Sequence, residues 1–176
     1  MYIRLTMSFN KRLSKEIQLY QKDDFKFPNL ILKPSDNLDL WYFIVYDLKD
    51  TEYENGIYLG KVILPPKYPF KAPDFQFLTP SGRFKINTKL CTSFTGYHQE
   101  LYSPSWNIAS MCAGLISFMT DSTDLIESKG IGSEITTVEF KKQTATNSIN
   151  YIKSNKLILD IFEKHFKEYF DTLMIH

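Results

Sequence analysis

Four short segments rich in aromatic and branched apolar residues constrain the fold of this 176-residue chain more than any other feature. They cover residues 30–32, 41–46, 57–64 and 75–78, and turn-forming residues separate them. Runs of this length, bounded by proline, glycine, asparagine and aspartate, are typical of β-strands joined by short connections. The pattern predicts a four-stranded antiparallel meander.

Helical patterns lie on both sides of the predicted meander. Four helices are expected, over about residues 10–22, 108–119, 137–154 and 156–173. The first is defined by apolar positions at helical spacing, namely Phe9, Leu13, Ile17 and Tyr20. Ser105 or Asn107 is available to cap the central helix. One helix before a meander, then a central helix and two C-terminal helices, predict an α+β domain.

The length and composition indicate one domain without a strong electrostatic preference. With 43% hydrophobic residues the chain can form a sizeable core, and we expect a single domain over residues 1–176, ordered from about 8 to 173. A formal net charge of +1 gives no reason to expect binding to nucleic acid or to an anionic membrane. The longest apolar run, residues 41–46, is too short to cross a bilayer.

The few cysteines and histidines do not suggest a disulfide framework or a metal site. Cys91 and Cys112 are the two cysteines, and they favour a reducing compartment. His98, His165 and His176 are isolated from one another, so their spacing is not that of zinc ligands. We expect neither a metal nor a cofactor.

Residues 65–73 contain four prolines in nine positions and predict a stiff surface loop between the third and fourth strands. Proline lacks the backbone N–H that a central strand needs, so this segment cannot belong to the sheet interior. Phe70 lies within the loop. Its ring is either tucked under the prolines or presented to a partner.

Cys91 is the candidate nucleophile. It follows a loop that contains Pro80 and Gly82, between the last predicted strand and the central helix, and Asn87 precedes it by four residues. A thiol in irregular surface backbone, with an amide nearby that could hold an oxyanion, points first to acyl transfer. The alternative is a small buried residue without chemistry, which is the simplest interpretation of Cys112 on the apolar face of the central helix.

The order of these elements and motifs resembles the ubiquitin-conjugating enzymes over nearly the whole chain. The motifs are Tyr-Pro-Phe-Lys-Ala-Pro at residues 68–73, the pair Asn87 and Cys91, and Ser-Pro-Ser at 103–105. Residues 79–84, 87–91, 97–98 and 115–119 look more narrowly like the branch that works at the endoplasmic reticulum in protein quality control. The resemblance implies the ubiquitin-conjugating (UBC) fold.

The same resemblance implies an activity for Cys91. Its thiol would accept ubiquitin from the activating enzyme as a thioester and pass it to lysine of a substrate protein. Asn87 matches the asparagine of the family's His-Pro-Asn motif, which stabilises the oxyanion, the loop, or both. Lys85 and Ile86 stand where that motif has His-Pro, and the interval to Cys91 is shortened, as it is in the narrower branch.

The residue that activates the acceptor stays open among several candidates. The family usually has an acidic or hydroxyl side chain beyond the central helix, and Asp121, Ser122 and Asp124 are available there. His98 is a further candidate, seven residues after the cysteine in irregular chain, with a surface histidine of no function as its alternative. Relatives in the branch can also modify serine or threonine, and we hypothesise that this chain shares that range.

The resemblance also implies which surfaces meet partners. The first-helix positions used toward the activating enzyme, and partly toward RING-type ligases, are Lys11, Arg12 and Lys15; a solvated helix face would explain them equally well. The positions that match the two loops gripped by ligases are Phe70, Ser103, Pro104 and Ser105. Expected partners are therefore ubiquitin, its activating enzyme, a RING-type ligase and substrate proteins, while ATP is consumed by the activating enzyme.

Location and two alternative functions depend on features beyond the motifs. The branch normally ends in a membrane anchor, which the sequence to His176 does not contain, so an anchor in a longer protein and a relative without one are both compatible. With an anchor, the protein is expected at the cytosolic face of the endoplasmic reticulum. The alternatives are an inactive variant that binds ubiquitin or a ligase, and a cysteine hydrolase that uses His98 or His165. A modifier other than ubiquitin is also compatible.

Overall fold

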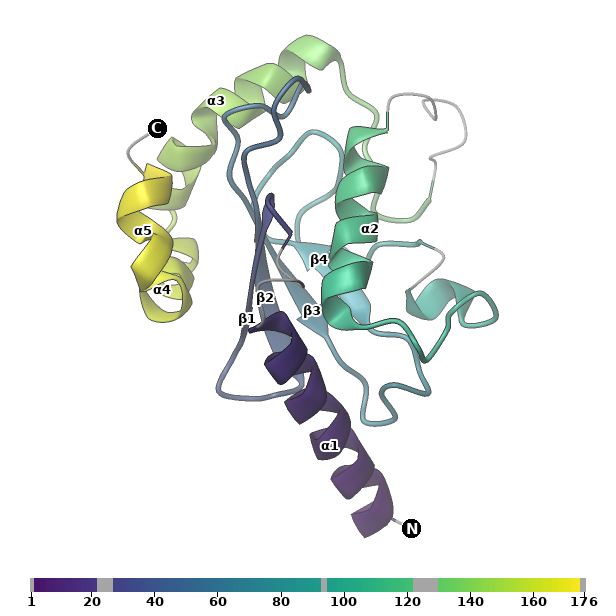
Figure 1. The fold of residues 1–176 in the computed structure, drawn as a ribbon. Helices are drawn as coiled ribbons and strands as arrows, with labels where there is room; N and C mark the ends of the chain where they lie inside the picture. The colour runs from purple at the N-terminus through teal and green to yellow at the C-terminus, as the bar shows by residue number, and fades with distance from the viewer. Residues whose placement is uncertain (1, 22–26, 93–94, 122–129, 175–176) are drawn as a thin grey trace.

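The computed structural model describes residues 2–21, 27–92, 95–121 and 130–174, and its centre is a four-stranded antiparallel sheet (Figure 1). The strands, in chain order and in spatial order, are β1 Leu30–Pro34, β2 Leu40–Val45, β3 Tyr58–Ile63 and β4 Asp74–Phe77. The predicted meander is confirmed, with strand limits within two residues of those expected.

One interlocking pair marks the alignment of the two middle strands. Phe43 on β2 is paired with Gly60 on β3, and a Cβ atom at Gly60 would lie 2.1 Å from the Phe43 ring. The ring therefore occupies the space that any other residue would fill with its side chain. Phe43 also makes an edge contact with Phe77 of β4, at 5.4 Å between ring centroids, which links three strands.

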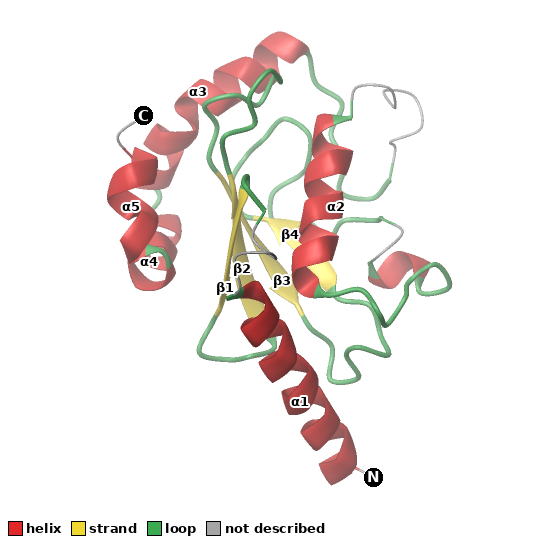
Figure 2. Cartoon of the chain, viewed as in Figure 1, coloured by secondary structure: helices red, strands yellow, loops and turns green. Residues whose placement is uncertain are grey.

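The helices described in the structure lie around the sheet (Figure 2). Their bounds are α1 Tyr2–Tyr20, η2 Gly96–His98, α2 Ile108–Thr120, α3 Val138–Ser154, α4 Lys156–His165 and α5 Lys167–Met174. Helix α2 lies on one face of the sheet, and its buried side chains share a core with Trp41 and Phe43. Helices α3 to α5 lie on the other side, so both faces of the sheet are covered.

The outer face of the sheet packs on a second core formed by the C-terminal helices. The sheet contributes Ile31, Ile44 and Leu59; the helices contribute Ile152, Ile158, Phe162, Phe166 and Leu173. This explains why the strands read as nearly continuous apolar runs, since neither face is left to water.

Two helix predictions differ from the structure. The first helix begins at Tyr2 and not near residue 10, because no proline or glycine interrupts residues 2–20 and the helix continues through them. The single helix expected over 156–173 is wrong: it is divided into α4 and α5, which follow α3 in the described part of the chain. The break lies at Phe166, whose backbone leaves the helical region (φ −128°, ψ 21°) while its ring is fully buried against Phe162.

Capping side chains fix where the helices begin. Asn107 accepts a hydrogen bond from the backbone N–H of Ser110, and the Ser110 hydroxyl accepts one from the N–H of Asn107, so the two form a capping box at the start of α2. Thr137 and Asn155 cap α3 and α4 with one side-chain hydrogen bond each, accepted from the N–H groups of Phe140 and Ile158. Of the two candidates named from the sequence, Asn107 is therefore the cap of α2.

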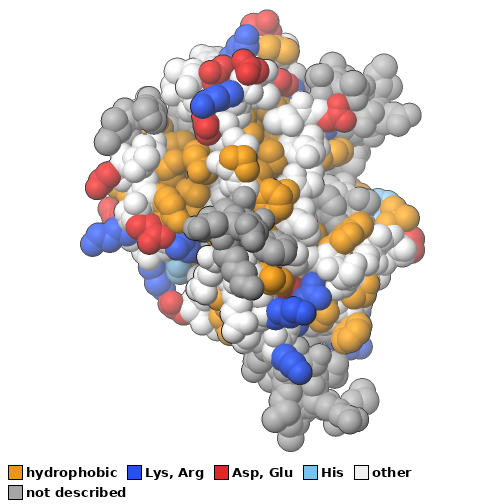
Figure 3. Space-filling model, viewed as in Figure 1, with side chains coloured by type: hydrophobic (Ala, Val, Ile, Leu, Met, Phe, Trp, Pro, Cys, Tyr) orange, Lys and Arg blue, Asp and Glu red, His pale blue; other side chains and the backbone are white. Residues whose placement is uncertain are grey.

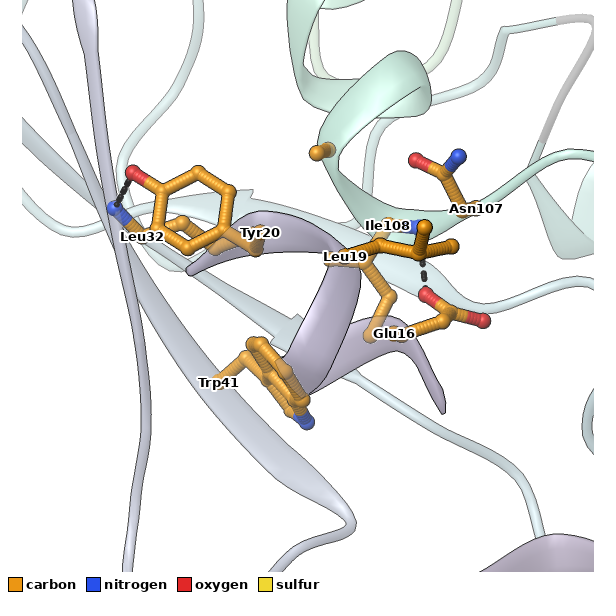
Figure 4. A pocket seen from close by; sticks show the side chains of 8 residues that line it. Glu16, Leu19, Tyr20, Leu32, Trp41, Asn107 and Ile108 are labelled. Carbon is orange, nitrogen blue, oxygen red and sulfur yellow. Dashed lines mark hydrogen bonds between the residues drawn. The ribbon is translucent and has the colours of Figure 1, made fainter. Parts of the chain in front are cut away.

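The buried carboxylate of Glu16 joins α1 to two distant segments. Its Oε1 accepts hydrogen bonds from the Arg12 guanidinium and from the Tyr68 hydroxyl, and its Oε2 accepts one from the backbone N–H of Ile108 at 2.8 Å. Figure 4 shows this last contact at the first turn of α2. A negative charge there is favourable because the first N–H groups of a helix have no partner within it. Burial beside this carboxylate raises the pKa of Tyr68.

Replacing Glu16 should therefore weaken the whole fold. Glu16→Ala removes the acceptor of three buried or half-buried donors, and we expect the free energy of unfolding to fall by about 3 kcal/mol. The exposed Glu163 on α4 is a matched control, for which Glu163→Ala should change stability by less than ~0.5 kcal/mol. Urea unfolding of both variants measures the difference, and equal stabilities would show that the Glu16 contacts are not stabilising.

A half-buried histidine at the end of α4 packs on the sheet. The ring of His165 lies 5.0 Å from that of Tyr42 on β2, and burial together with the Lys164 ammonium lowers the pKa of His165. Two exposed ion pairs flank it, Lys164 with Asp36 and Lys33 with Glu168. These pairs lower the pKa of both carboxyl groups, which titrate at lower pH than histidine.

Mild acid should therefore destabilise the protein through His165. The lowered pKa means that the unfolded chain binds the proton more readily, so the stability present above about pH 6.5 is lost as pH falls through the lowered pKa. Thermal unfolding between about pH 7.5 and about pH 5.5 should show a larger drop in midpoint for the parent chain than for His165→Phe, which keeps a ring on Tyr42. Identical drops would remove His165 as the cause.

Candidate active site

Cys91 lies in irregular backbone that is fixed from two sides. The N–H of Leu90 donates to the carbonyl of Phe75 at 3.0 Å, and the N–H of Cys91 donates to the carbonyl of Ile131 at 2.9 Å. Cys91 is half-buried and not disulfide-bonded, whereas Cys112 on α2 is 1% exposed and burial raises the pKa of its thiol. The Cys91 thiol is thus accessible to a reactant, whereas the Cys112 thiol is part of the core.

A tight turn brings the chain after Cys91 back toward the sulfur. The hydroxyl of Thr95 accepts a hydrogen bond from the N–H of Thr92 and donates to its carbonyl. The 3₁₀ helix η2 starts directly after Thr95, and the N–H of His98 donates to the Thr95 carbonyl at 3.1 Å. His98 therefore returns to the thiol although seven residues separate them in sequence.

The imidazole of His98 connects the thiol to a carboxylate. Its Nε2 lies 3.1 Å from Sγ of Cys91, and its Nδ1 lies 3.2 Å from Oε1 of Glu100. A carboxylate accepts but does not donate, so Nδ1 carries a proton in this arrangement and Nε2 offers its lone pair to the thiol. The His98 and Glu100 side chains are 43% and 69% exposed, so an incoming molecule can reach them.

Glycines on the opposite side allow the chain to approach Cys91 closely. A Cβ at Gly130 would lie 3.1 Å from the Cys91 carbonyl oxygen. Gly132 has φ +88°, and a Cβ there would lie 2.8 Å from the carbonyl oxygen of Lys89. Residues 130–132 thus form a close-fitting support for the segment that carries the thiol, which the sequence alone did not reveal.

The other residues predicted around the thiol lie at different places. Asn87 has a left-handed backbone (φ 55°), its N–H donates to the carbonyl of Phe77 at 2.8 Å, and its side chain is exposed. Asp121 is the exposed C-cap of α2, where its N–H donates to the Ser117 carbonyl. Ser122 and Asp124 lie outside the described residues. Of the candidates within those residues, His98 is the one with a contact to Sγ given by the structure.

An open groove of about 420 Å³ runs beside the Cys91 segment. Its lining comes from the proline-rich loop, β4, and the residues before and after the thiol, namely Lys71, Ala72, Asp74, Lys89, Gly96 and Gln99. Lys89 and Asp74 form an ion pair at 2.6 Å across it, and Gln99 accepts a hydrogen bond from the N–H of Ala72. The groove therefore presents charged and amide side chains next to the segment that carries Cys91.

The residues predicted to contact partners differ in their exposure and in their intramolecular hydrogen bonds. Phe70 is 62% exposed, so its ring is presented and not tucked under the prolines. Lys11, Lys15, Pro104 and Ser105 are exposed. Arg12 is engaged within the molecule, since its guanidinium donates to the carbonyls of Pro104 and Trp106 as well as to Glu16. The hydroxyls of Ser103 and Ser105 bond to each other at 2.7 Å.

Three exposed residues near these sites were not identified from the sequence. Leu101 and Trp106, 57% and 36% exposed, extend the apolar part of the surface formed by residues 103–106. In Figure 3, basic side chains gather over the α1 end of the molecule close to hydrophobic ones. Glu100 was also missed, although its spacing of two residues from His98 was a signal that could have been used.

Within the described residues, no group of three or more histidine, cysteine, aspartate or glutamate side chains is arranged to hold a metal ion. The helices described there also include none that is long and apolar enough to span a membrane.

Comparison with known proteins identifies the family. The model of the family described as ubiquitin-conjugating enzyme matches residues 12–128, which include the C-terminal half of α1, the sheet, Cys91 and α2. The chain belongs to the ubiquitin-conjugating enzyme family. Helices α3 to α5 lie outside the matched range, so the helical side of the second core is formed by residues beyond that range.

Relatives of two named types confirm the predicted family and branch. The ubiquitin-conjugating enzyme E2 J2-like of Dictyostelium discoideum is 36% identical over 152 residues, which are 86% of this chain and 85% of that protein. The E2 6 of Schizosaccharomyces pombe is 43% identical, covering 76% and 58%, and the human E2 J2 is 32% identical, covering 94% and 61%. The chain thus spans about three fifths of the latter two proteins.

Solved structures confirm the predicted UBC fold. A ubiquitin-conjugating enzyme E2 of Plasmodium vivax is 28% identical with a TM-score of 0.53, over 62% of this chain and 99% of that one. UbcA1 of Agrocybe aegerita, at 21% identity and a TM-score of 0.56, covers 65% of this chain and 83% of its own, and it supports the fold alone.

Proposed function

We propose that this protein accepts ubiquitin from the activating enzyme as a thioester on Cys91 and transfers it to a substrate with a RING-type ligase. The observation that carries the proposal is the half-buried Cys91 thiol, in contact with the exposed His98, within a family of ubiquitin-conjugating enzymes. The thiol of this pair can take an acyl group, while Cys112, the other described thiol, is buried.

Transfer of the acyl group from the thioester to an acceptor requires little chemical catalysis by the protein. A thioester carbonyl is electrophilic enough for an amine to attack, so the enzyme contributes mainly by orienting the two partners and steadying the oxyanion. The groove beside Cys91 suits the extended C-terminal tail of ubiquitin or an acceptor segment. In this proposal Asn87 supports the loop through its backbone, and its exposed amide is available toward the oxyanion.

Lysine is the primary acceptor in this proposal, and serine and threonine hydroxyls are further acceptors. The cellular role that fits the E2 J2 and E2 6 relatives is protein degradation associated with the endoplasmic reticulum. Free thiols suit the cytosolic side of that membrane, which we propose as the location if an anchor follows the core in the full-length protein.

Two other functions predict different behaviour. An inactive scaffold of the same fold would bind ubiquitin or a ligase without covalent chemistry. A cysteine hydrolase requires a histidine beside the thiol and a third group that orients it, and Cys91, His98 and Glu100 satisfy that arrangement. The family match favours conjugation over hydrolysis, and one experiment separates the three functions.

The test incubates the protein with ubiquitin, activating enzyme and ATP, followed by electrophoresis with and without reductant. We expect an adduct that reductant removes, that is absent in Cys91→Ala, and that resists reductant in Cys91→Ser because an oxygen ester replaces the thioester. Cys112→Ala, which changes the buried cysteine, should keep the adduct. No adduct would favour the scaffold, and cleavage of ubiquitin esters without ATP would favour the hydrolase.

The ligase is proposed to bind where three segments meet. Phe70 projects from the proline-rich loop, Pro104 and Ser105 lie in the loop before α2, and the Arg12 guanidinium ties that second loop to α1. An exposed aromatic ring on a stiff loop makes a good anchor, since little conformational freedom is lost when it docks.

Phe70→Ala should therefore slow ligase-stimulated discharge by roughly 30-fold, the loss typical of an interface anchor, and leave thioester formation unchanged. Leu157→Ala on α4 is the matched control, because Leu157 is 70% exposed on an element outside this surface. Discharge is measured with and without a RING domain. A Phe70 variant that also fails to form the thioester would show that the ring is needed for the fold and not for the ligase.

A further inference from the structure

The contact between His98 and Cys91 places a proton acceptor next to the atom that carries the acyl group. Nε2 lies 3.1 Å from Sγ, and Glu100 holds Nδ1 on the far side of the ring. In the thioester the carbonyl carbon is bonded directly to Sγ. An atom that attacks this carbon therefore passes within reach of Nε2.

The Glu100 carboxylate sets the form in which the imidazole meets that atom. Because the carboxylate only accepts hydrogen bonds, it favours the tautomer with a proton on Nδ1 and a free lone pair on Nε2. It also stabilises the imidazolium that forms when Nε2 takes up a proton. Exposure of both side chains, 43% and 69%, leaves the acceptor a way in from solvent.

We propose that His98 is the catalytic base that activates the acceptor and that Glu100 is the residue that positions it. This inference rests on the proposed function. In the step, the acceptor oxygen or nitrogen forms a bond to the thioester carbonyl carbon as Nε2 removes its proton. The carbon–sulfur bond then breaks, and the departing sulfur of Cys91 takes the proton from Nε2. Ubiquitin is left as an ester or amide on the acceptor, with the thiol restored.

Two kinds of acceptor should depend on this pair to different degrees. A hydroxyl is a poor nucleophile until its proton is removed, so serine or threonine needs the base as the bond forms. Hydroxylamine and the neutral fraction of lysine attack with a nitrogen lone pair and need it less. The Cys91–His98–Glu100 arrangement is therefore a determinant of acceptor range as well as of rate.

The experiment uses full-length protein loaded with ubiquitin and separated from the activating enzyme and ATP, so that differences in loading do not enter. Single-turnover discharge is followed with free serine, threonine, lysine and hydroxylamine. His98→Ala should lose roughly 100-fold with serine, the usual contribution of a general base, and change little with hydroxylamine. Glu100→Gln should show a smaller loss with the same selectivity. Imidazole in solution should restore serine discharge to His98→Gly.

Matched variants separate this role from a structural one. Glu139→Gln changes an exposed carboxylate on α3, and Asp121→Asn changes the acidic residue at the end of α2. The first should behave as the parent chain with every acceptor, and the second should lose much less serine discharge than His98→Ala. Selective loss with imidazole rescue supports the proposal.

Four results would overturn it. The first is an equal loss with serine and hydroxylamine, which means general damage. The second is unchanged serine discharge in His98→Ala, and the third is a larger loss in Asp121→Asn than in His98→Ala. The fourth is a loaded parent chain that reacts with lysine and never with serine or threonine. A parent chain that forms no reductant-sensitive adduct refutes the proposed function itself, which is a different outcome in a different assay.

Discussion

The Glu16 carboxylate accepts hydrogen bonds from three parts of the chain that are far apart in sequence: α1 through Arg12, the proline-rich loop through Tyr68, and the first turn of α2 through Ile108. A carboxylate with 5% exposure is tolerated only because these donors and the helix terminus compensate for its lost hydration. Arg12 extends the same contact to the carbonyls of Pro104 and Trp106. The three segments of the proposed ligase surface, α1 and the two loops, are therefore tied together through Glu16 and Arg12.

The fold was largely predictable because local patterns and tertiary contacts agree. The strands end where turn residues occur, and Asn107 caps α2 through a motif that spans only three residues. The predictions fail where a contact between residues far apart in sequence determines the local structure. The break at Phe166 depends on burial of its ring against Phe162 and the outer face of the sheet. The spacing of apolar residues in the sequence does not reveal such a contact. The early start of α1 was missed although Tyr2 and Leu5 continue the helical spacing that was read only from Phe9 onward.

The site was predictable in its nucleophile and less so in its surroundings. Cys91 was identifiable by its position between a strand and a helix. His98 stayed one of several candidates, because the sequence of an irregular segment does not show whether the chain returns to the thiol. The turn closed by Thr95 makes it return. Glu100 and the glycine support at residues 130–132 contact the Cys91–His98 pair only in three dimensions. Arg12, assigned to partners from the sequence, turns out to be held by intramolecular bonds as well.

The Phe43 ring over Gly60 has a consequence for how the sheet assembles. In a sheet that is buried on both faces, hydrophobic burial does not select one strand register. A shift of one residue moves each apolar side chain from one buried face to the other. A slip by one residue would place Leu59 or Lys61 opposite Phe43, at the pairing position where even a Cβ on residue 60 would lie 2.1 Å from the ring. The absence of a side chain at Gly60 thus selects one register between β2 and β3, because the neighbouring registers are sterically excluded.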